Sequence, residues 1–411
     1  QSDRQVGDLD IQPVEEREYY SVSSAQKRIF LFQQFEGDNT VYNIPTIMEI
    51  QGKLDIKRVE DVFCKLIDRH ETLRTSFDLK DGQIVQKIHK NVEFKVGYAE
   101  VEMEMAQELV ESFIRPFNLS KAPFIRVQII KIGEERYILL CDMHHIITDG
   151  VSTAILIREF VELYQGKELQ GLRIQYKDFS EWQNKSFESG SIKNQRDYWL
   201  NKFSGDIPVL DLPTDYTRPA KQTFEGDSIS FEVSRELTEA IRKISSETGT
   251  TLYMTLLGAY NVLLSKYSGQ DDIIVGSPVA GRPHVELENV IGIFVNMIPI
   301  RTKIDNSKTF VEFLKTLKES TVEAFENQDY QFEMLIDDLN YEKNFSRNPL
   351  FDTVFVLQNV EVEESEIEGL KFIPYKWQGH SVSRFDLLFE ATENEGKINF
   401  KVEYSTALFK K

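Results

Sequence analysis

Two adjacent histidines are the residues of this sequence best suited to chemistry. His144 and His145 lie in the segment MHHIITDG, in which Asp149 follows four residues after the second histidine and precedes Gly150. An imidazole accepts or donates a proton near neutral pH, so the pair is a candidate for acid–base catalysis. A buried carboxylate at the position of Asp149 needs a cationic or hydrogen-bonding partner. The segment is therefore the first candidate for a functional site.

The elements around this segment must hold the two histidines in place. The run 137–143 (YILLCDM) is apolar and of strand length, and a helical pattern extends from Gly150 to Gly166, with Ser152 as its predicted N-cap. Neighbouring side chains on an extended chain point to opposite faces, so one histidine can face a cleft while the other packs behind it. The same geometry argues against a metal site, because adjacent ligands would point apart. A catalytic pair and a structural pair both stay open.

The composition limits the classes of protein to consider. The 411 residues carry 67 acidic and 48 basic side chains, a formal net charge of −19, and 41% of them are hydrophobic. Such a chain can bury a sizeable core, and its acidic balance argues against nucleic-acid and membrane partners. The two cysteines, Cys64 and Cys141, exclude a disulfide framework, and Cys141 is predicted to be a buried structural residue. No apolar run approaches the ~20 residues of a membrane span, so we expect a soluble cytoplasmic protein.

Helical and strand patterns alternate along both halves of the chain, which predicts the α/β class. Apolar residues recur at helical spacing from Asp55 to about Phe77, and residues 206–226 are rich in proline and turn residues, which is typical of a connection between two halves. Residues 1–17 lack periodicity and are predicted to be a linker from a preceding unit. Further helices are predicted over 234–247 and 251–267, and strands over 272–276, 294–300, 353–357, 387–390 and 398–404.

Several common active-site signatures are absent from the sequence. There is no G-x-S-x-G elbow, no Walker A loop, no G-x-G-x-x-G, no H-E-x-x-H and no C-x-x-C. A nucleophilic serine hydrolase, a nucleotide-dependent enzyme and a zinc hydrolase therefore lose their usual support. The histidine segment is left as the main candidate.

The segment MHHIITDG resembles the H-H-x-x-x-D-G signature of the condensation domains of nonribosomal peptide synthetases and their acyltransferase relatives. Other segments resemble the remaining motifs of that family, in the family's order. They are SVSSAQKR (21–28), RHETLRTSF (69–77), YKDFSEW (176–182), YW (198–199), IGIFVN (291–296), NQDYQFE (327–333) and SRNPL (346–350). The resemblance extends from about Tyr19 to the C-terminus, and Gln331 and Met297 stand where the family usually has proline and threonine.

This resemblance implies an α/β fold of two chloramphenicol-acetyltransferase-like lobes that form a V-shaped pseudo-dimer with a central tunnel. After the linker 1–17, residues 18–178 would form the N-terminal lobe and residues 179–411 the C-terminal lobe. Family members usually continue with a helical segment beyond the last strand. We therefore expect the C-terminal end of the domain to be truncated in this chain.

The resemblance also implies an activity. A carrier-bound acyl or peptidyl thioester would be the donor, the α-amine of a carrier-bound aminoacyl group the acceptor, and an amide the product. The expected partners are upstream donor and downstream acceptor peptidyl carrier domains and an adjacent adenylation domain, with the excised domain monomeric. The domain itself would bind no metal or cofactor, because phosphopantetheine arms arrive on the carrier proteins. The motif variants favour joining an L-donor to an L-acceptor.

Two other functions stay open. A free-standing acyltransferase would share the histidine signature but use coenzyme A thioesters. A non-catalytic docking module would recruit other proteins, although such modules tend to lose the histidines.

Site residues follow from the motifs that they match. His145 is predicted to accept the proton of the attacking amine or to orient that amine, with His144 as packing support and the amide of Gly150 close to the substrate. Asp149 is expected to be structural and to pair with an arginine of the R-H-E-x-L-R motif. Arg69 is the first choice for that partner and Arg74 the second.

Four further residues are predicted to contact substrate. They are Ser24, Trp182, Trp199 and Asn296. A tryptophan in a long amphipathic segment is also a common core residue, so packing stays the alternative for both tryptophans. The loop 276–282 (GSPVAGR) is expected to contribute to the crossover between the lobes.

Overall fold

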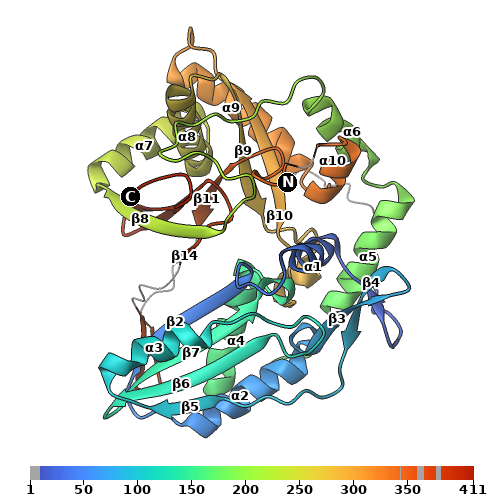
Figure 1. Cartoon of the computed structure of the whole chain (residues 1–411), viewed down its shortest axis with the longest axis vertical. Coiled ribbons are helices and arrows are strands. Elements are labelled where there is room, and N and C mark those ends of the chain that lie inside the picture. The colour runs from blue at the N-terminus through green and yellow to red at the C-terminus, as the bar shows by residue number, and fades with distance from the viewer. Residues whose placement is uncertain (1–9, 343, 359–364, 376–380) are drawn as a thin grey trace. The chain divides into compact units, whose positions relative to one another are not determined.

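The computed structural model describes residues 10–342, 344–358, 365–375 and 381–411. The chain divides into two compact units, each of which combines helices with β-sheet (Figure 1). The α/β class predicted from the sequence is confirmed. Unit 1 comprises residues 1–191, 280–295 and 362–379, and unit 2 comprises residues 192–279, 296–361 and 380–411.

Unit 1 is built on a six-stranded sheet in the order β12-β13-β2-β7-β6-β5. Its two middle strands, β2 (Asn43–Gln51) and β7 (Arg136–His144), pair antiparallel along their whole length, which places His144 opposite Asn43. β7 contains the apolar run 137–143, so that strand prediction is confirmed. The other strands of this sheet are β5 (Gly97–Glu100), β6 (Ile125–Gly133), β12 (Ser365–Ile367) and β13 (Leu370–Pro374). A smaller sheet contains β1 (Tyr20–Ser21), β4 (Gln83–Ile88) and β3 (Thr75–Lys80).

The helices of unit 1 follow from caps and apolar spacing. In α2 (Ile56–Arg69), the carboxylate of the N-cap Asp55 accepts a hydrogen bond from the backbone N–H of Arg58 at 3.0 Å. Apolar residues three and four apart line its buried face. The remaining helices are α1 (Ser24–Glu36), α3 (Met103–Phe113), α4 (Gly150–Tyr164) and α5 (Tyr176–Ser189), with short 3₁₀ turns η1 (Glu71–Arg74), η2 (His145–Ile147) and η3 (Val285–Asn289).

The helix predicted from Asp55 to about Phe77 is wrong beyond Arg69. His70 has extended backbone angles (φ −104°, ψ 104°), and η1 and β3 follow it. Phe77 is buried in β3 as it would have been in a helix. The apolar spacing therefore continues through a change of secondary structure that it does not reveal.

Unit 2 is built on a seven-stranded sheet in the order β10-β9-β11-β15-β16-β8-β14, in which β11 runs parallel to both of its neighbours. The helices and strands predicted for this half are confirmed, except that the strand predicted over 294–300 begins only at Asn296. The strands are β8 (Glu225–Val233), β9 (Asp272–Val279), β10 (Asn296–Lys303), β11 (Thr353–Gln358), β14 (Ser381–Val382), β15 (Leu387–Asn394) and β16 (Lys397–Ser405). The helices are α6 (Lys193–Lys202), α7 (Arg235–Thr248), α8 (Leu252–Ser268), α9 (Phe310–Glu326) and α10 (Phe332–Asp338).

The units differ from the predicted lobes 18–178 and 179–411. Unit 1 extends to Ser191, and it includes two segments of the second half, Ala280–Val295 and Val362–Gly379. The second of these segments joins unit 1 because β13 pairs antiparallel with β2. The first segment joins unit 1 through hydrogen bonds to the histidine segment, which are described below.

The predicted linker is only partly described. Residues 1–9 lie outside the described residues. Within the rest, the side chain of Ile11 is fully buried in the core of unit 1, and the backbone N–H of Val14 donates to the carboxylate of Asp178 at 2.8 Å. The segment that precedes Tyr19 is therefore attached to unit 1 at Ile11 and Val14, whereas most of its other described residues are exposed.

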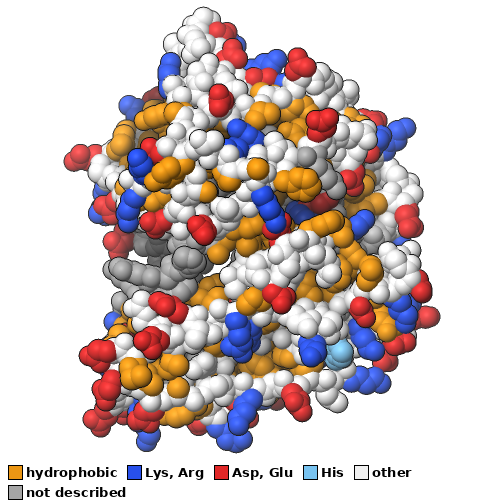
Figure 2. Space-filling view, viewed as in Figure 1, with side chains coloured by type: hydrophobic (Ala, Val, Ile, Leu, Met, Phe, Trp, Pro, Cys, Tyr) orange, Lys and Arg blue, Asp and Glu red, His pale blue; other side chains and the backbone are white. Residues whose placement is uncertain are grey.

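Two surface properties bear on the expected partners. Among the described residues, the helices are all too short or too polar to cross a membrane. On the face shown in Figure 2, acidic and basic side chains are interspersed. That face therefore shows no large area of a single charge sign.

Candidate functional site

The histidine segment forms the turn between the end of β7 and the start of α4. His144 is the last residue of β7, His145 begins η2, and Asp149 is the N-cap of α4. The backbone N–H of His144 donates to the carbonyl of Phe124 at 3.0 Å, and that of His145 donates to the carbonyl of Tyr42 at 2.8 Å. These backbone bonds attach both histidines to the framework of unit 1.

His144 is buried and uncharged. Its Nδ1 accepts from the backbone N–H of Ile146 at 3.1 Å, and its Nε2 lies 2.9 Å from Oε1 of Gln33. A ring nitrogen that accepts a hydrogen bond carries no proton, so the hydrogen bonds assign the proton to Nε2. Burial lowers the pKa of His144 to about 3, and the charges of His145 and Arg126 act in the same direction. His144 therefore cannot act as a base near neutral pH.

His145 has the opposite tautomer and is partly exposed. Its Nδ1 lies 2.8 Å from the carbonyl oxygen of Thr148. A carbonyl only accepts, so Nδ1 carries the proton and the lone pair of the neutral ring is on Nε2. The ring of Tyr42 meets the His145 ring edge-on, with 6.1 Å between their centroids. The site therefore provides one oriented nitrogen that can take a proton from a reacting group.

Asp149 joins the start of α4 to the segment that follows β9. One of its carboxylate oxygens accepts from the backbone N–H of Ser152 at 2.8 Å, and the other accepts from the backbone N–H of Phe294 at 2.9 Å. Asp149, rather than the predicted Ser152, is thus the N-cap of α4. The carboxylate is buried and acts as a structural node, as the sequence suggested.

Arg282 is the cation beside Asp149. Its Nη2 lies 3.5 Å from the carboxylate and 2.8 Å from Oγ of Ser152, and its Nη1 donates to the carbonyl oxygens of Leu287 and Val290. The guanidinium is buried, and this burial lowers the pKa of Arg282 while the charge of Asp149 opposes the shift. The arginine therefore holds together the histidine turn and the loop that carries it.

The prediction that Arg69 pairs with Asp149 is wrong. Arg69 is the last residue of α2, and its Nε donates to the carboxylate of Glu159 at 3.0 Å. Glu159 lies in the middle of α4, whereas Asp149 caps the first turn of that helix. The second choice, Arg74, donates to the carbonyl of His89 at 2.7 Å. Both arginines are used by partners that sequence spacing does not reveal.

The segment 290–295 is fastened to the histidine turn by further bonds. Oγ of Ser152 donates to the carbonyl of Gly292 at 2.7 Å and accepts from its N–H at 3.0 Å. The hydroxyl of Tyr176 donates to the carbonyl of Ile293 and lies 2.7 Å from Oγ of Ser23. A Cβ on Gly292 would lie 1.8 Å from the Tyr176 ring, so only glycine fits there.

Gly150 is the first residue of α4 and is exposed. Its φ is not in the left-handed region, so the backbone conformation does not require glycine at this position. A Cβ at Gly150 would meet no described atom within 4 Å. Its amide lies at a helix N-terminus, where backbone N–H groups favour negative charge. A position beside the substrate stays a prediction.

Ser24 and Trp182 lie on neighbouring helices of unit 1. The backbone N–H of Ser24 donates to the Gln183 side chain at 2.9 Å, which ties α1 to α5. Trp182 is partly buried against the core and stacks on Phe179, with 6.0 Å between the centroids. Packing accounts for much of Trp182, and contact of either residue with substrate stays a prediction.

Trp199 and Asn296 are structural, contrary to their predicted roles in substrate binding. Trp199 is 1% exposed, and its Nε1–H donates to the carbonyl of Asn327 at 2.7 Å. The amide nitrogen of Asn296 donates to the carbonyl oxygens of Gln328 and Tyr330, and its oxygen accepts two backbone N–H groups. Both polar groups are saturated within unit 2, which leaves neither side chain free to contact a substrate.

Two other sets of reactive groups lie outside the histidine site. Cys141 is buried and unpaired, and burial raises the pKa of its thiol to about 12, so the predicted structural role is supported. Among the described residues, Asp10, His284 and Glu286 place ligand atoms within 4.8 Å of one another. Glu286 is already paired with Arg173.

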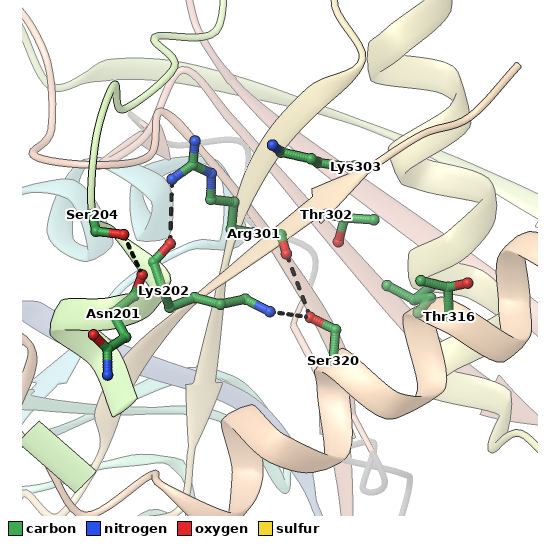
Figure 3. Close-up of a pocket in the computed structure, with 9 residues that line it drawn as sticks. Asn201, Lys202, Ser204, Arg301, Thr302, Lys303, Thr316 and Ser320 are labelled. Carbon is green, nitrogen blue, oxygen red and sulfur yellow. Dashed lines mark hydrogen bonds between the residues drawn. The ribbon is translucent and has the colours of Figure 1, made fainter. Parts of the chain in front are cut away.

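A cavity of about 410 Å³ lies in unit 2, away in sequence from the histidine turn (Figure 3). Two of its cations are already engaged: Arg301 contacts the carboxylate of Asp272 at 2.8 Å, and Nζ of Lys202 donates to Oγ of Ser320 at 2.8 Å. It contains none of the predicted site residues. The cavity is lined by Asn201, Lys202, Ser204, Arg301, Thr302, Lys303, Thr316, Leu317 and Ser320.

Comparisons with known proteins give the family. The model of the condensation domain matches residues 16–411. Bacitracin synthase 3 of Bacillus licheniformis is 50% identical over 401 residues, which cover 98% of this chain and 6% of that protein. Gramicidin S synthase 2 of Aneurinibacillus migulanus is 50% identical over 404 residues, 98% of this chain and 9% of that protein. The chain spans less than a tenth of the length of these relatives.

Solved structures give the fold. The X-domain from teicoplanin biosynthesis superimposes with a TM-score of 0.88 at 22% identity, covering 98% of this chain and 93% of that one. A four-domain nonribosomal peptide synthetase bound to AMP and glycine superimposes with a TM-score of 0.87 at 22% identity, covering 98% of this chain and 32% of that one. The first condensation domain of the calcium-dependent antibiotic synthetase, in complex with a substrate analogue, superimposes with a TM-score of 0.78 at 17% identity, covering 96% of this chain and 93% of that one. The predicted two-lobed, chloramphenicol-acetyltransferase-like fold is confirmed. The chain belongs to the condensation-domain family of the nonribosomal peptide synthetases.

Proposed function

We propose that this chain forms an amide bond between a carrier-bound acyl or peptidyl thioester and the α-amine of a carrier-bound aminoacyl group. The observation that carries the proposal is the tautomer of His145, whose Nδ1 proton is held by the carbonyl of Thr148 at 2.8 Å. That bond leaves Nε2 as the basic nitrogen of a partly exposed ring in the family's signature motif.

The reaction needs only a modest base. An α-amine has a pKa of about 8, so part of it is neutral near pH 7 and can attack the thioester carbonyl directly. As the C–N bond forms, the nitrogen becomes acidic, and Nε2 of His145 accepts its proton. The C–S bond then breaks, and the same proton passes to the departing thiolate. In this proposal His145 also orients the amine, and the amide of Gly150, at the N-terminus of α4, would stabilise the developing oxyanion.

A reconstituted condensation assay tests this proposal. A donor carrier protein loaded with an L-aminoacyl thioester and an acceptor carrier loaded with a second L-amino acid are mixed with the chain, and dipeptidyl product is followed by mass spectrometry. We expect product with the wild type and a loss of about 10²–10⁴-fold with His145→Ala. His89→Ala, which changes a histidine of unit 1 outside both the histidine turn and the segment 280–295, is the matched control. Full condensation by His145→Ala would refute the catalytic role.

The same assay separates the two rival functions. A free-standing acyltransferase would form product from coenzyme A thioesters and a diffusible amine, without carriers. A docking module would bind carriers or other proteins and form no product in either arm. The chain shares its fold with the X-domain from teicoplanin biosynthesis, and a shared fold alone does not establish activity. Both arms of the assay are therefore needed.

The finer parts of the proposal concern configuration and partners. The motif variants favour an L-donor, so a D-aminoacyl donor should react more slowly by at least about tenfold. The greater length of the relatives and the four-domain synthetase of the same fold support further domains as partners. We propose that these are upstream and downstream peptidyl carrier domains and an adjacent adenylation domain. Phosphopantetheine arms on the carriers would be the only prosthetic groups at the site. The free cysteines Cys64 and Cys141 support a reducing compartment, the cytoplasm, and we propose a monomer for the excised domain.

A further inference from the structure

We propose that Gln33 is a positioning residue that holds His144 in a single tautomer, and that a partly buried cluster around Arg126 fixes the loop whose carbonyl orients Gln33. We use the name Arg126 cluster for Asn43, Arg126 and Asp142. The effect on catalysis rests on the proposed condensation function. The effect on the histidine ring does not depend on that function and can be measured without it.

Gln33 connects the histidine turn to the loop that follows α3. It is buried on α1, with 8% of its surface exposed. Its Nε2 donates to the carbonyl of Phe117 at 2.8 Å, and its Oε1 accepts from Nε2 of His144 at 2.9 Å. If the amide were rotated by 180°, its NH₂ group would face the N–H of His144, and its oxygen would face the carbonyl oxygen of Phe117. The carbonyl of Phe117 therefore determines which end of the amide faces His144.

The tautomer of His144 matters for the neighbouring turn. With its proton on Nε2, the ring offers Nδ1 as the acceptor for the backbone N–H of Ile146. Ile146 belongs to η2, the turn that begins with His145. In the other tautomer, that buried N–H would lose its acceptor, at a cost large enough to displace the turn. Gln33 thus acts on the orientation of His145 through His144 and Ile146.

The Arg126 cluster holds the loop that presents the Phe117 carbonyl. Nη2 of Arg126 donates to the carbonyl oxygens of Arg115 at 2.7 Å and Pro116 at 3.0 Å. The guanidinium lies 3.5 Å from the centroid of the Phe117 ring. The side-chain amide of Asn43 donates to the same Arg115 carbonyl at 2.9 Å. Three consecutive residues of the loop are therefore fixed by two side chains.

Asp142 completes the cluster from the strand that carries His144. Its side chain is fully buried, accepts from the amide of Asn43 at 2.7 Å and lies 3.8 Å from Nη1 of Arg126. It is two residues before His144 in β7, so both side chains are on the same face of that strand. The charged groups near His144 are thus Arg126, Asp142 and His145. Arg126, and His145 whenever its ring is protonated, oppose a proton on His144, and Gln33 contributes no charge that would favour one.

The experiment replaces Gln33 by a carboxylate of the same shape. In Gln33→Glu, the new charge faces Nε2 of His144 and stabilises its imidazolium, while the donor to Phe117 is lost. Gln34→Glu makes the same change one residue later at an exposed position and is the matched control. Histidine-selective ¹⁵N NMR of the whole chain reports the tautomer and charge of His144, with assignment by single histidine replacements. The condensation rate is measured against pH in parallel.

Three results support the proposal. Wild-type His144 is neutral with its proton on Nε2 at pH 7, Gln33→Glu converts it to imidazolium, and kcat falls by about tenfold or more with a new ionisation in its pH profile. Gln34→Glu matches the wild type in both measurements. For the cluster, Arg126→Lys makes the His144 signal heterogeneous, whereas Arg136→Lys, on the same strand as Asp142 and half exposed, does not.

Other results overturn it. A wild-type His144 protonated on Nδ1 would refute the role of Gln33, and this result does not depend on whether the variant folds. A Gln33→Glu spectrum identical to that of the wild type would refute it as well. An unchanged His144 signal in Arg126→Lys would refute the role of the cluster. Correct NMR results together with no condensation by the wild type would instead refute the proposed function and leave this inference standing.

Discussion

Two buried carboxylates lie on either side of the histidine pair, and the molecule satisfies them differently. Asp149 accepts from two backbone N–H groups at 2.8 and 2.9 Å, with Arg282 further away at 3.5 Å. Asp142 accepts from the side chain of Asn43 at 2.7 Å, and Arg126 lies 3.8 Å away. The other oxygen of Asp142 has no partner among the described residues. One carboxylate is held by rigid backbone donors and the other by side chains.

The difference teaches which carboxylate builds the site and which one responds to pH. Burial raises the pKa of Asp142 to about 6, because one amide and a distant guanidinium do not replace the water that it lost. Asp149 instead joins α4 to the segment after β9 through directed N–H groups. Substitutions at Asp149 should therefore cost folding, and substitutions at Asp142 should change the pH dependence of stability.

Removing the Asp149 carboxylate should have the largest effect. In Asp149→Ala, the N-cap of α4 and the acceptor for Phe294 are lost, and Arg282 is left as a buried charge without a counter-ion. We expect the free energy of unfolding to fall by ~3–5 kcal/mol and condensation to be lost. Urea denaturation followed by circular dichroism measures the first effect. Asp68→Ala, at an exposed position on α2, is the control. A loss below ~1 kcal/mol would contradict the role of Asp149 as a node.

Double-mutant cycles should identify the partner of Asp149. We expect Asp149→Asn and Arg282→Ala to couple by ~1–3 kcal/mol, since the two side chains share a buried contact. Asp149→Asn and Arg69→Ala should couple by less than ~0.5 kcal/mol, because Arg69 pairs with Glu159. The unfolding free energies of the single and double variants give both coupling energies. Equal coupling to the two arginines would contradict this assignment.

The sequence predicted the turn but not what holds it. The apolar run 137–143, the helix after Gly150 and the two histidines on opposite sides of an extended chain are visible to pattern alone, because strand and helix periods are local properties. The partner of Asp149 is not local. Arg282 is 133 residues away and reaches the turn through a loop whose course depends on tertiary packing. A lone arginine between Gly281 and Pro283, in an otherwise apolar loop, was the only available signal.

Other errors have the same physical origin. Arg69 was chosen because it belongs to the R-H-E-x-L-R motif, but a motif does not show which turn of a neighbouring helix the side chain reaches. Arg69 contacts Glu159 in the middle of α4. Asn296 and Trp199 lie in motifs that resemble the family's and carry polar groups, yet those groups already donate hydrogen bonds to nearby backbone carbonyls. Gln33 was missed because an amide on a helix has no distinctive spacing.

Asp142 and His144 should change the stability of the protein in opposite directions as the pH rises. A buried carboxylate with a raised pKa contributes stability that is present below its unfolded value, near 4, and lost as the pH rises to about 6. His144, with its pKa lowered to about 3, contributes stability that is present above its unfolded value, near 6.5, and lost as the pH falls. In the wild type, the two trends oppose each other between pH 4 and 6.

Asp142→Asn removes one of these trends and leaves the other. Relative to the wild type, the variant should gain stability as the pH rises from about 4 to 6, by up to ~1.4 kcal/mol per pH unit. Chemical denaturation at a series of pH values measures this difference. Asp68→Asn should run parallel to the wild type. A constant offset between Asp142→Asn and the wild type across this range would show that Asp142 titrates at its ordinary pKa.

The smallest effect on stability, and the sharpest separation of folding from function, is expected at Gly150. A methyl group there meets no described atom within 4 Å, and the residue starts a helix, so Gly150→Ala should change the unfolding free energy by less than ~1 kcal/mol. If the amide of Gly150 lies against the reacting thioester, as proposed, the same methyl group occupies the substrate's space. The value of kcat/KM should then fall by about tenfold or more.

Gly166→Ala is no suitable control, because Gly166 has a φ of 75° and would be strained by a side chain. Val151→Ala, at the next exposed position, is suitable instead. Undiminished condensation by a stable Gly150→Ala protein would place the substrate elsewhere and leave the contrast between Asp142 and Asp149 untouched.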